Sequence, residues 1–423
     1  MVSTDGFMFV KLRWILSLFR NTHQTKIMAS TSSSAGRKVT SSKDLGHVLV
    51  TGGCGGLGTQ IINLLLERKA CSKLSAMDLR PASEPISGCE YHFGDLTSEG
   101  AMRELFIKIK PTIVIHTASP KFNMADEILY KVNVDGTKTL LRVASETGVK
   151  AFVYTSSASV ISDNSTDLIN ADETYPLVTG KAQPEYYTNT KMQALAEQAV
   201  LEYNRPASNP RFLTCALRPS GIFGVGDQTL LPPMLAPYYK GQTKFQLGEN
   251  INLFDFTEST NVAHAHHLAA AALLTTAERE EQGQISPLDH EKVDGEAFFI
   301  TNDSPMYFWD FTRTAWRNLG DTTAPNQIWT INKDFGLFIA TLFEWIFWIF
   351  QLGVPNLTRQ KVKFSCMTRY YSIEKAKRRL GYRPVVGVTE GLKRGVADCV
   401  RRGVIPGSPE EAQRLGSESK KAQ

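Results

Sequence analysis

The chain reads Val50-Thr-Gly-Gly-Cys-Gly-Gly-Leu-Gly58 at the point where an apolar run ends and a helical pattern begins. Glycines at Gly52, Gly55 and Gly58 allow a tight turn, a close approach of the backbone to a pyrophosphate, and close packing of the helix on the sheet. The helix N-terminus adds N–H groups and a partial positive charge. A strand, this loop and a helix in that order predict a dinucleotide-binding unit.

Short apolar runs alternate with helical patterns from Gly46 onward, which is typical of a parallel α/β sheet. We expect strands at 47–51, 73–77, 91–93, 112–116, 151–155 and 212–217, and helices at 56–69, 98–109, 125–147 and 184–203. This order predicts a doubly wound parallel (Rossmann) sheet.

The domain organisation follows from this pattern. We expect residues 47–217 to form the NAD-binding Rossmann domain, and residues 218–405 to form a smaller C-terminal substrate-binding region. The second region is expected to hold a helix at 261–276 and a polar surface insertion at 278–294. Residues 406–423 are a polar tail that we expect to be frayed.

Composition limits the function classes. The chain is 42% hydrophobic and 21% charged, as in an ordinary globular protein, and its 6 cysteines lack ligand spacing and are typical of a reducing, intracellular setting. The net charge of +5 lies wholly within residues 1–46, so the remaining chain is neutral. A nucleic-acid-binding face is therefore not expected, because such a face would leave the folded body positive.

The basic tail, residues 1–46, joins a short apolar run at 7–19 to a Ser/Thr-rich stretch at 30–42. The run is too short and too charged for a membrane-spanning helix, and it lacks the features of a secretory signal. Three interpretations remain: a membrane-surface helix, an organelle transit segment, or an upstream extension. Met28 could itself begin a chain, so the place of residues 1–27 in the mature protein stays open.

An aromatic segment at 335–350 does not fit an ordinary substrate-binding region. It holds seven aromatic side chains, and Glu344 is its only charged residue. It is shorter than the roughly 20 residues needed to span a bilayer. Aromatic residues favour the membrane interface, so we expect a helix lying in one leaflet. The alternative is a buried helix that lines an apolar substrate pocket or a dimer contact.

Two aspartates follow predicted strands and are candidates for cofactor binding. Asp78 stands 20 residues beyond Gly58, where a carboxylate can accept hydrogen bonds from adenosine ribose hydroxyls and would repel a 2′-phosphate. This favours NAD, although Arg80 could offset the repulsion and leaves NADP as the alternative. Asp95 is expected either to face the adenine or to cap the helix that begins near Ser98.

The candidate catalytic residues lie in two stretches, Tyr187-Thr-Asn-Thr-Lys191 on a predicted helix and Tyr154-Thr-Ser-Ser157 at a strand end. Spacing of four places Tyr187 and Lys191 on one helical face. The nearby ammonium and an oxidised nicotinamide both lower the pKa of the phenol, so that Tyr187 can accept an alcohol proton. Ser157 or Ser156 would hold the same substrate oxygen.

With these stretches in place, the chain resembles the extended short-chain dehydrogenase/reductases. Within them it is most similar to the 3β-hydroxysteroid dehydrogenase group and its decarboxylating sterol-4α-carboxylate 3-dehydrogenases. The resemblance runs from about His47 to Val400. Besides the stretches above, it rests on His116-Thr-Ala-Ser-Pro120, Asn133-Val-Asp-Gly-Thr137, Leu217-Arg-Pro-Ser-Gly-Ile-Phe-Gly224, Asn261-Val-Ala-His-Ala-His266, and Tyr371-Ser-Ile-Glu-Lys-Ala with Leu380-Gly-Tyr.

The resemblance implies NAD bound by Gly52, Gly55, Gly58 and Asp78, with Lys191 at the nicotinamide ribose and catalysis by Ser157, Tyr187 and Lys191. It implies oxidation of the 3β-hydroxyl of a sterol or triterpenoid, with loss of CO₂ from a 4α-carboxylate, as in C-4 demethylation. The expected location is the cytosolic face of the endoplasmic reticulum membrane. The expected protein partner is a second copy of the chain or a sterol-demethylation complex.

Three other functions stay open. The first is a 3β-hydroxy-Δ5-steroid dehydrogenase/isomerase, which needs a second acid/base group that the sequence does not reveal. The second is a nucleotide-sugar epimerase or dehydratase, against which the aromatic segment argues. The third, from another class, is a non-catalytic NAD-sensing regulator, which would be expected to lack the Tyr187 and Lys191 pair.

Some residues depart from the family pattern. Gly56 stands where the family usually has Phe, and we expect it to loosen the phosphate loop. Glu258-Ser-Thr260 replaces a more apolar approach to Asn261, and we expect it to alter part of the substrate pocket. Three histidines, His264, His266 and His267, lack a carboxylate or cysteine to complete a ligand set, so they are expected to be core or surface histidines and no metal site is expected.

Overall fold

The computed structural model describes residues 43–82, 84–120, 124–179, 188–353, 355 and 357–414. Most of the basic tail, residues 180–187 with the candidate catalytic Tyr187, and the end of the chain after residue 414 therefore lie outside the described residues. The helices are α2 (Gly56–Glu67), α3 (Glu99–Ile109), α4 (Asp126–Tyr130), α5 (Thr137–Glu146), α6 (Thr188–Glu202), α7 (Leu231–Tyr239), α8 (Ser259–Glu281), α9 (Phe308–Arg317), α10 (Lys333–Ile349), α11 (Arg359–Cys366), α12 (Glu374–Arg379) and α13 (Val388–Arg402), with a π-helix η1 (Lys131–Gly136) and 3₁₀ turns η2 (Ala158–Ile161) and η4 (Pro325–Gln327).

A seven-stranded parallel sheet forms the centre of the fold, in the order β12-β7-β5-β4-β1-β2-β3. Its strands are β1 (His47–Thr51), β2 (Lys73–Asp78), β3 (Glu90–Phe93), β4 (Ile113–His116), β5 (Ala151–Thr155), β7 (Leu213–Pro219) and β12 (Ala297–Ile300). The predicted doubly wound parallel sheet is confirmed. The seventh strand, β12, was not predicted, and it comes from the half of the chain expected to bind substrate.

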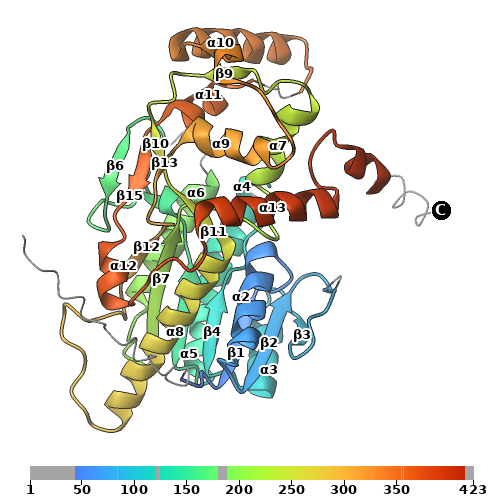
Figure 1. Ribbon diagram of the computed structural model, residues 1–423. Coiled ribbons are helices and arrows are strands. Elements are labelled where there is room, and N and C mark those ends of the chain that lie inside the picture. Colours follow the sequence, from blue (N-terminus) through green and yellow to red (C-terminus); the bar gives the residue numbers. More distant parts are fainter. Residues whose placement is uncertain are drawn as a thin grey trace, which may run out of the picture. The chain divides into compact units, whose positions relative to one another are not determined.

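Helices cover both faces of this sheet (Figure 1). On one face α8 packs against α2 and against β4, β5 and β7. On the other face α5 packs between α3 and α6. The central strands β1, β4 and β5 are buried along nearly their whole length because both faces are covered, as in other doubly wound sheets, whereas the edge strand β3 is partly exposed. Helix α8 thus belongs to the packing of the parallel sheet, although it too lies beyond residue 217.

The predicted helix at 125–147 is interrupted. It consists of α4, the π-helix η1 and α5 in direct succession. In η1, a Cβ on Gly136 would lie 3.1 Å from the Cβ of Leu96, so the backbone approaches the loop after β3 closely. Periodicity cannot reveal a single π turn, because its wider spacing lasts for only one turn.

The remaining strands form small sheets. The second sheet has the order β13-β10-β15-β6, and two strand pairs, β11-β8 and β14-β9, lie beside it. Their bounds are β6 (Leu168–Ala171), β8 (Gly221–Phe223), β9 (Phe245–Leu247), β10 (Leu253–Phe254), β11 (Phe256–Glu258), β13 (Met306–Tyr307), β14 (Trp329–Ile331) and β15 (Arg369–Tyr371). A separate aromatic core joins α7, α9 and α13 to β8 and β11, with Phe256 stacked on Phe311 at 3.5 Å between ring centroids.

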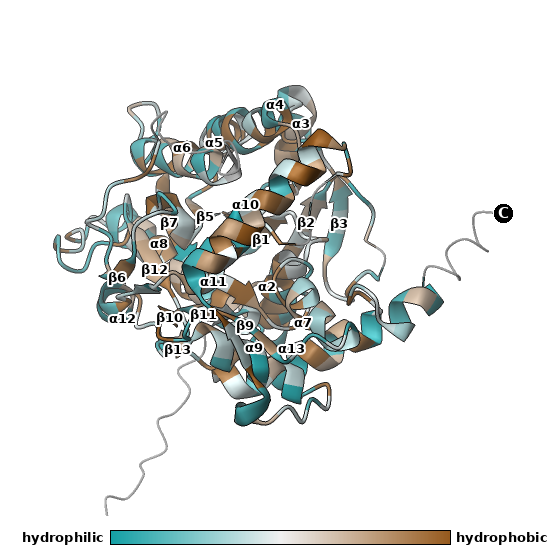
Figure 2. Cartoon of the chain, turned by 90° about the horizontal axis from the view of Figure 1, so that it is seen from above, coloured by the Kyte–Doolittle hydropathy of each residue, from teal (hydrophilic) through white to brown (hydrophobic). Residues whose placement is uncertain are grey.

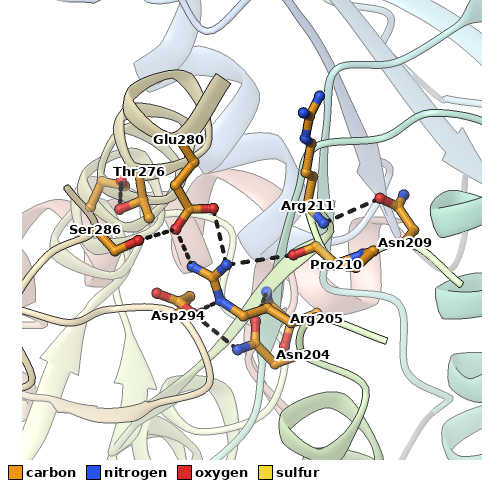
Figure 3. Close-up of polar contacts among 11 residues, drawn as sticks. Asn204, Arg205, Asn209, Pro210, Arg211, Thr276, Glu280, Ser286 and Asp294 are labelled. Atoms are coloured by element: carbon orange, nitrogen blue, oxygen red, sulfur yellow. Dashed lines mark hydrogen bonds and ion pairs between the residues drawn. The ribbon is translucent and has the colours of Figure 1, made fainter. Parts of the chain in front are cut away.

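The polar segment 278–294, expected to be a surface insertion, is in part helical and in part buried. Helix α8 continues to Glu281, and Asp294 is buried at 1% exposure. Figure 3 shows Arg205 between the two carboxylates of Glu280 and Asp294, with Nη2–Oε1 and Nε–Oδ2 distances of 2.6 and 2.7 Å. This network fastens the C-terminal end of α8 to the loop between α6 and β7.

The polar C-terminal tail begins with structure. Residues 409–414 are helical, and Nε of Arg414 donates a hydrogen bond to the carbonyl of Gly403, just beyond α13, at 3.0 Å. The expectation of a frayed end from residue 406 is therefore wrong as far as residue 414.

Helix α10 carries the aromatic segment and leaves its large side chains exposed. Figure 2 looks onto this helix, which lies across the face nearest the viewer and is largely hydrophobic in colour. Trp345 is 63% exposed and Trp348 is 77% exposed, whereas Gly336 and Ala340 are buried. The alternative of a helix buried in this chain's own core is therefore wrong. Among the described residues no helix is long and apolar enough to cross a membrane.

Candidate active site

The glycine loop between β1 and α2 is packed so tightly that side chains cannot enter it. Gly52 has a φ of +72°, and a Cβ there would lie 2.7 Å from the Cα of Ala118. A Cβ on Gly58 would clash with the carbonyl oxygen of Gly52, which accepts a hydrogen bond from the N–H of Gly55 at 3.0 Å. These contacts explain why glycine occupies Gly52 and Gly58.

The first turn of α2 opens onto a cavity. Gly55 is the N-cap, and no side chain in the described part of the chain caps this helix. A cavity of about 210 Å³ lies there, lined by Gly56 and Leu57 of α2 and by residues after β8 that include Val225 and Gln228. Uncapped N–H groups at a helix N-terminus favour an anion, so the loop and cavity suit a phosphate group such as the pyrophosphate of a dinucleotide.

The expectation that Gly56 loosens this loop is wrong. A Cβ on Gly56 would clash with the carbonyl oxygen of Gly226, and a Cβ on Gly226 would lie 3.2 Å from the Cα of Gly56. The two backbones are in direct contact. Glycine at position 56 therefore allows a tight contact between the phosphate loop and the loop after β8.

Asp78 lies at the end of β2, beside the glycine loop. Its Oδ2 accepts a hydrogen bond from the N–H of Cys54 at 3.1 Å, and its Oδ1 accepts one from the N–H of Arg80 at 3.2 Å. The carboxylate is thus fixed next to the phosphate loop, where ribose hydroxyls could donate to its remaining lone pairs.

Asp95 closes the turn that leads into α3. Its Oδ1 accepts hydrogen bonds from the N–H and the hydroxyl of Thr97, both at 2.8 Å. The N-cap of α3 is Ser98, which makes no side-chain capping bond. Asp95 therefore acts as a turn-forming residue before the helix.

A buried histidine supports the loop from behind. The Nδ1 of His116 lies 2.6 Å from Oγ1 of Thr51, and its Nε2 lies 3.0 Å from Oγ1 of Thr137. Burial lowers the pKa of His116 to about 3, so its ring is neutral at physiological pH. This bridge connects the ends of β1 and β4 to α5, and it was not recognised as a unit from the sequence.

Ser156 and Ser157 directly follow β5 and have different surroundings. Ser156 is 4% exposed, and its Oγ has no hydrogen-bond partner among the described residues. Ser157 is partly exposed and is the N-cap of η2, where its Oγ accepts from the N–H of Ser159 at 3.1 Å. Thr155, just before them, contacts His266 at 2.7 Å, which links this strand end to α8.

Lys191 lies in the first turns of α6, and Tyr187 lies outside the described residues. A buried ion pair fixes this helix against the sheet: Glu197 of α6 is fully buried and accepts from Nη2 of Arg218 in β7 at 2.6 Å. Sequence reasoning missed Glu197. A signal existed, since Arg218 ends a strongly apolar strand and needs a carboxylate partner there.

The three histidines of α8 have protein partners. Arg68, the C-cap of α2, donates toward the Nδ1 atoms of His264 and His267 at 2.8 and 3.1 Å, and Nδ1 of His266 contacts the carbonyl of Val262. Burial lowers the pKa of each of the three rings to about 4. Within the described part of the chain, no three His, Cys, Asp or Glu side chains lie close enough to share a metal ion.

Glu258 serves the start of α8. Its Oε2 accepts from the N–H groups of Thr260 and Asn261 at 2.6 and 3.3 Å, and the side chain is buried. Glu258 is thus the N-cap of α8, and Ser259 beside it lines the cavity at α2, so the expected effect of this stretch on the substrate pocket stays a prediction. Asn261 in turn accepts from the N–H groups of Val385 and Val386, which holds the segment before α13.

The topology brings the candidate residues to one edge. All strands of the main sheet are parallel, so their C-terminal ends lie on the same side. The glycine loop, Asp78 and Ser157 follow β1, β2 and β5 at that edge. Ligands of open α/β sheets bind there.

Several sequence relatives of the chain carry the name of one enzyme. A model described as the 3-beta hydroxysteroid dehydrogenase/isomerase family matches residues 49–330. Proteins named sterol-4-alpha-carboxylate 3-dehydrogenase, decarboxylating, are similar to the chain. The one from Schizosaccharomyces pombe is 41% identical over 84% of this chain and 97% of its own length. The Saccharomyces cerevisiae protein is 39% identical over 83% and 97%, and the Bos taurus protein is 36% identical over 82% and 90%.

Solved structures share the fold at lower identity. UDP-glucose 4-epimerase from Thermotoga maritima has a TM-score of 0.59 at 18% identity, covering 83% of this chain and 98% of its own. A dTDP-glucose 4,6-dehydratase from Bacillus anthracis has a TM-score of 0.58 at 17% identity, covering 84% and 96%. These likenesses establish the fold alone. By its match over residues 49–330 and its relatives above 30% identity, the chain belongs to the 3-beta hydroxysteroid dehydrogenase/isomerase family.

Proposed function

We propose that this protein oxidises the 3β-hydroxyl of a 4α-carboxysterol or related triterpenoid with NAD, and that CO₂ is lost from the product. The observation that carries the proposal is the similarity, over nearly their whole length, to relatives named for this activity. The glycine loop, Asp78 and Ser157 at one sheet edge support it, because an alcohol dehydrogenase needs a dinucleotide beside a hydroxyl-binding group.

The dinucleotide site is assigned to residues that the fold holds rigidly. Gly52, Gly55 and Gly58 would surround the pyrophosphate, and Asp78 would accept from the adenosine ribose. Only Oδ1 of Asp95 takes part in the turn bonds to Thr97, and the carboxylate would face the adenine with its other oxygen. A nicotinamide cofactor held there supplies the hydride acceptor. NAD is favoured over NADP because Asp78 would repel a 2′-phosphate.

The catalytic roles fall to Ser157, Tyr187 and Lys191. The Oγ of Ser157 receives a backbone N–H, so its own proton remains available for the substrate oxygen. Tyr187 would take the hydroxyl proton, and the Lys191 ammonium would lower the pKa of the phenol and contact the nicotinamide ribose. Glu197 and Arg218 would keep α6, the helix that carries Lys191, at a fixed distance from β7.

Decarboxylation needs no additional protein group. Oxidation converts the 3β-alcohol into a ketone, and the 4α-carboxylate then lies β to that ketone. When the bond to the carboxylate breaks, its electrons pass to the ketone as an enolate and CO₂ leaves; protonation of the enolate gives the 3-ketone. The residues that oxidise the alcohol are therefore sufficient for the decarboxylating reaction as well.

The direct test is a reaction of the full chain in detergent with NAD and a 4α-carboxy-3β-hydroxysterol. We expect equal amounts of NADH and CO₂, and Tyr187→Phe should lower both by at least about 10²-fold. NADH together with an isomerised enone and no CO₂ would replace this proposal with the dehydrogenase/isomerase. Turnover of a nucleotide sugar, or cofactor binding with no turnover of any alcohol, would contradict it.

We also propose that α10 lies in the membrane surface from which the sterol is drawn, on the cytosolic face of the endoplasmic reticulum. Its small residues face inward, where a Cβ on Gly336 would contact Val362 of α11, and its aromatic residues face outward. Glu344 is the only charged residue in the aromatic segment 335–350, and it is paired with Arg359 at 2.6 Å. An amphipathic aromatic helix of this kind is suited to one leaflet.

Flotation of the full chain with liposomes tests this placement. The variant Phe338→Ser/Trp345→Ser/Trp348→Ser should lose most of its lipid-bound fraction. Trp329→Ser, which removes a similarly exposed indole at 70% exposure outside α10, is the matched control and should still float. Equal flotation of the triple variant and the wild type would contradict the placement. If the wild type is a dimer and the triple variant is a monomer that still binds lipid equally well, α10 is instead a dimer contact.

A further inference from the structure

The loop Gly224–Asp227, which follows β8, is held by the C-terminal helix α13. Oδ2 of Asp398 accepts a hydrogen bond from the N–H of Gly226 at 2.9 Å. Nη2 of Arg402 donates to the carbonyl of Asp227 at 2.6 Å, and Nε of Arg402 donates to Asp398 at 2.7 Å. Asp398 is 6% exposed, so this bonded pair is largely shielded from water.

Glycines bring α13 and the loop into backbone contact. A Cβ on Gly395 would lie 2.8 Å from the Cα of Gly224, and a Cβ on Gly391 would lie 2.6 Å from Cγ of Glu258. Residues four apart share a helix face, so this glycine face of α13 lies directly on the loop and on the start of α8. At Gly391 the facing atoms belong to side chains, whereas at Gly395 the backbone of Gly224 lies directly opposite, so a methyl group there would press on the loop itself.

The opposite side of the same loop reaches the phosphate loop. Gly226 packs against Gly56 backbone to backbone, and both residues line the cavity at the first turn of α2. A displacement of the loop Gly224–Asp227 would therefore change the width of that cavity. No residue of α13 lines the cavity.

We propose that α13 sets the position of the cavity wall at the dinucleotide site, and that Asp398 is a positioning residue for cofactor binding. This inference rests on the proposed function only in assigning the cavity to a dinucleotide. Asp398 acts through Gly226 and Gly56 and does not itself touch the cofactor.

Two substitutions probe the contact from different directions. Asp398→Asn keeps the shape of the side chain but removes the charge that holds Gly226 and Arg402. Gly395→Ala adds a methyl group against Gly224 and should push the loop toward Gly56. Arg401→Gln is the matched control, since Arg401 also pairs with Asp398 at 2.7 Å but is 69% exposed and, within the described part of the chain, has no hydrogen bond or ion pair to the loop.

The experiment measures NADH binding to the full chain in detergent by fluorescence, together with steady-state kinetics and thermal melting. Both test variants should raise the NADH Kd and the KM for NAD by roughly 2- to 30-fold, the range expected for residues that act without ligand contact. The kcat at saturating NAD and the KM for the sterol should stay within about twofold, and Arg401→Gln should match the wild type.

Wild-type affinity in both test variants would overturn the inference. A parallel fall in melting temperature, kcat and affinity for both substrates would also overturn it, because that pattern marks a general loss of structure. Failure of the wild-type chain to bind NADH would instead contradict the proposed function, so the two failures are distinguishable.

Discussion

At the scale of single residues, the adjacent side chains of Ser156 and Ser157 differ in the hydrogen bonds that they make. Ser156 is buried without a partner among the described residues, whereas Ser157 already receives the N–H of Ser159. A hydroxyl whose lone pair is occupied has its proton directed elsewhere. Because Ser157 is also partly exposed whereas Ser156 is buried, we propose Ser157 as the donor to a developing alkoxide at the substrate oxygen.

We predict that Ser157→Ala lowers kcat by about 10²- to 10³-fold, the typical cost of removing one donor to a developing oxyanion. Ser156→Ala should change kcat by only a few-fold. Both are measured by NADH formation at saturating sterol. The reverse order of effects would assign the catalytic serine to position 156.

Asp78 supports a prediction about cofactor choice. Its carboxylate stands beside the phosphate loop, held by the N–H groups of Cys54 and Arg80. Asp78→Asn removes the negative charge and should lower the ratio of kcat/KM for NAD to that for NADP by at least about tenfold. The measurement is initial rate with each cofactor. An unchanged ratio would show that Asp78 does not face the ribose.

At the scale of elements, the position of α6 depends on one buried ion pair. Glu197 and Arg218 are 0% and 4% exposed, and the guanidinium also lies 5.2 Å from the ring centroid of Phe299. Removing one partner of such a pair leaves an uncompensated charge in the core. The pair joins the helix of Lys191 to β7, so its loss should reach the active site.

We predict that Glu197→Gln lowers the free energy of unfolding by about 3–5 kcal/mol, the usual cost of breaking a buried pair. Denaturant unfolding followed by circular dichroism measures this change. Glu202→Gln, at the exposed C-terminal end of the same helix, is the control and should change the value by less than about 1 kcal/mol. Similar effects of both substitutions would argue against the ion pair as the anchor of α6.

Sequence patterns predicted the elements that carry strong periodicity. The strands β1, β2, β4, β5 and β7 and the loop before α2 were recognised because apolar runs end in glycine or polar residues there. The strand β12 was not, since four apolar residues after a polar segment do not distinguish a strand from a loop or a buried helical turn. Strands of two or three residues, such as β10 and β13, leave no period to detect.

At the scale of the whole molecule, the parts of the site that the sequence could not reveal are contacts between distant segments. The contact of Gly56 with Gly226 joins residues 170 positions apart, and the bond of Asp398 to Gly226 joins residues 172 apart. The sequence indicated each glycine and each charge, but pairing them required the fold. For the same reason the sequence predicts that Gly56 loosens the phosphate loop, whereas in the fold Gly56 allows a tight contact with Gly226.

Buried histidines predict how stability depends on pH. Burial lowers the pKa of His116 to about 3 and that of His266 to about 4, whereas an unfolded chain binds these protons near pH 6.5. As pH falls from 6.5 to 4, the unfolded state takes up protons that the folded state refuses. The free energy of unfolding should therefore decrease over this window, by up to about 1.4 kcal/mol per pH unit for each ring.

Melting curves between pH 6.5 and 4.5 check this prediction. His116→Asn removes one of these rings, so its melting temperature should fall less steeply with decreasing pH than that of the wild type. His290→Gln, at an exposed position, is the control and should keep the wild-type slope. A variant slope equal to the wild-type slope would mean that His116 does not contribute.

The central claim is that a hydride leaves the C3 carbon of a sterol for a nicotinamide bound at the glycine loop, and a labelled substrate tests it most directly. A 4α-carboxy-3β-hydroxysterol carrying deuterium at the 3α position, incubated with the full chain and NAD, should give reduced cofactor that contains the deuterium, one label for each CO₂ released. Deuterium retained at C3 of the sterol, with no labelled NADH, would contradict the account.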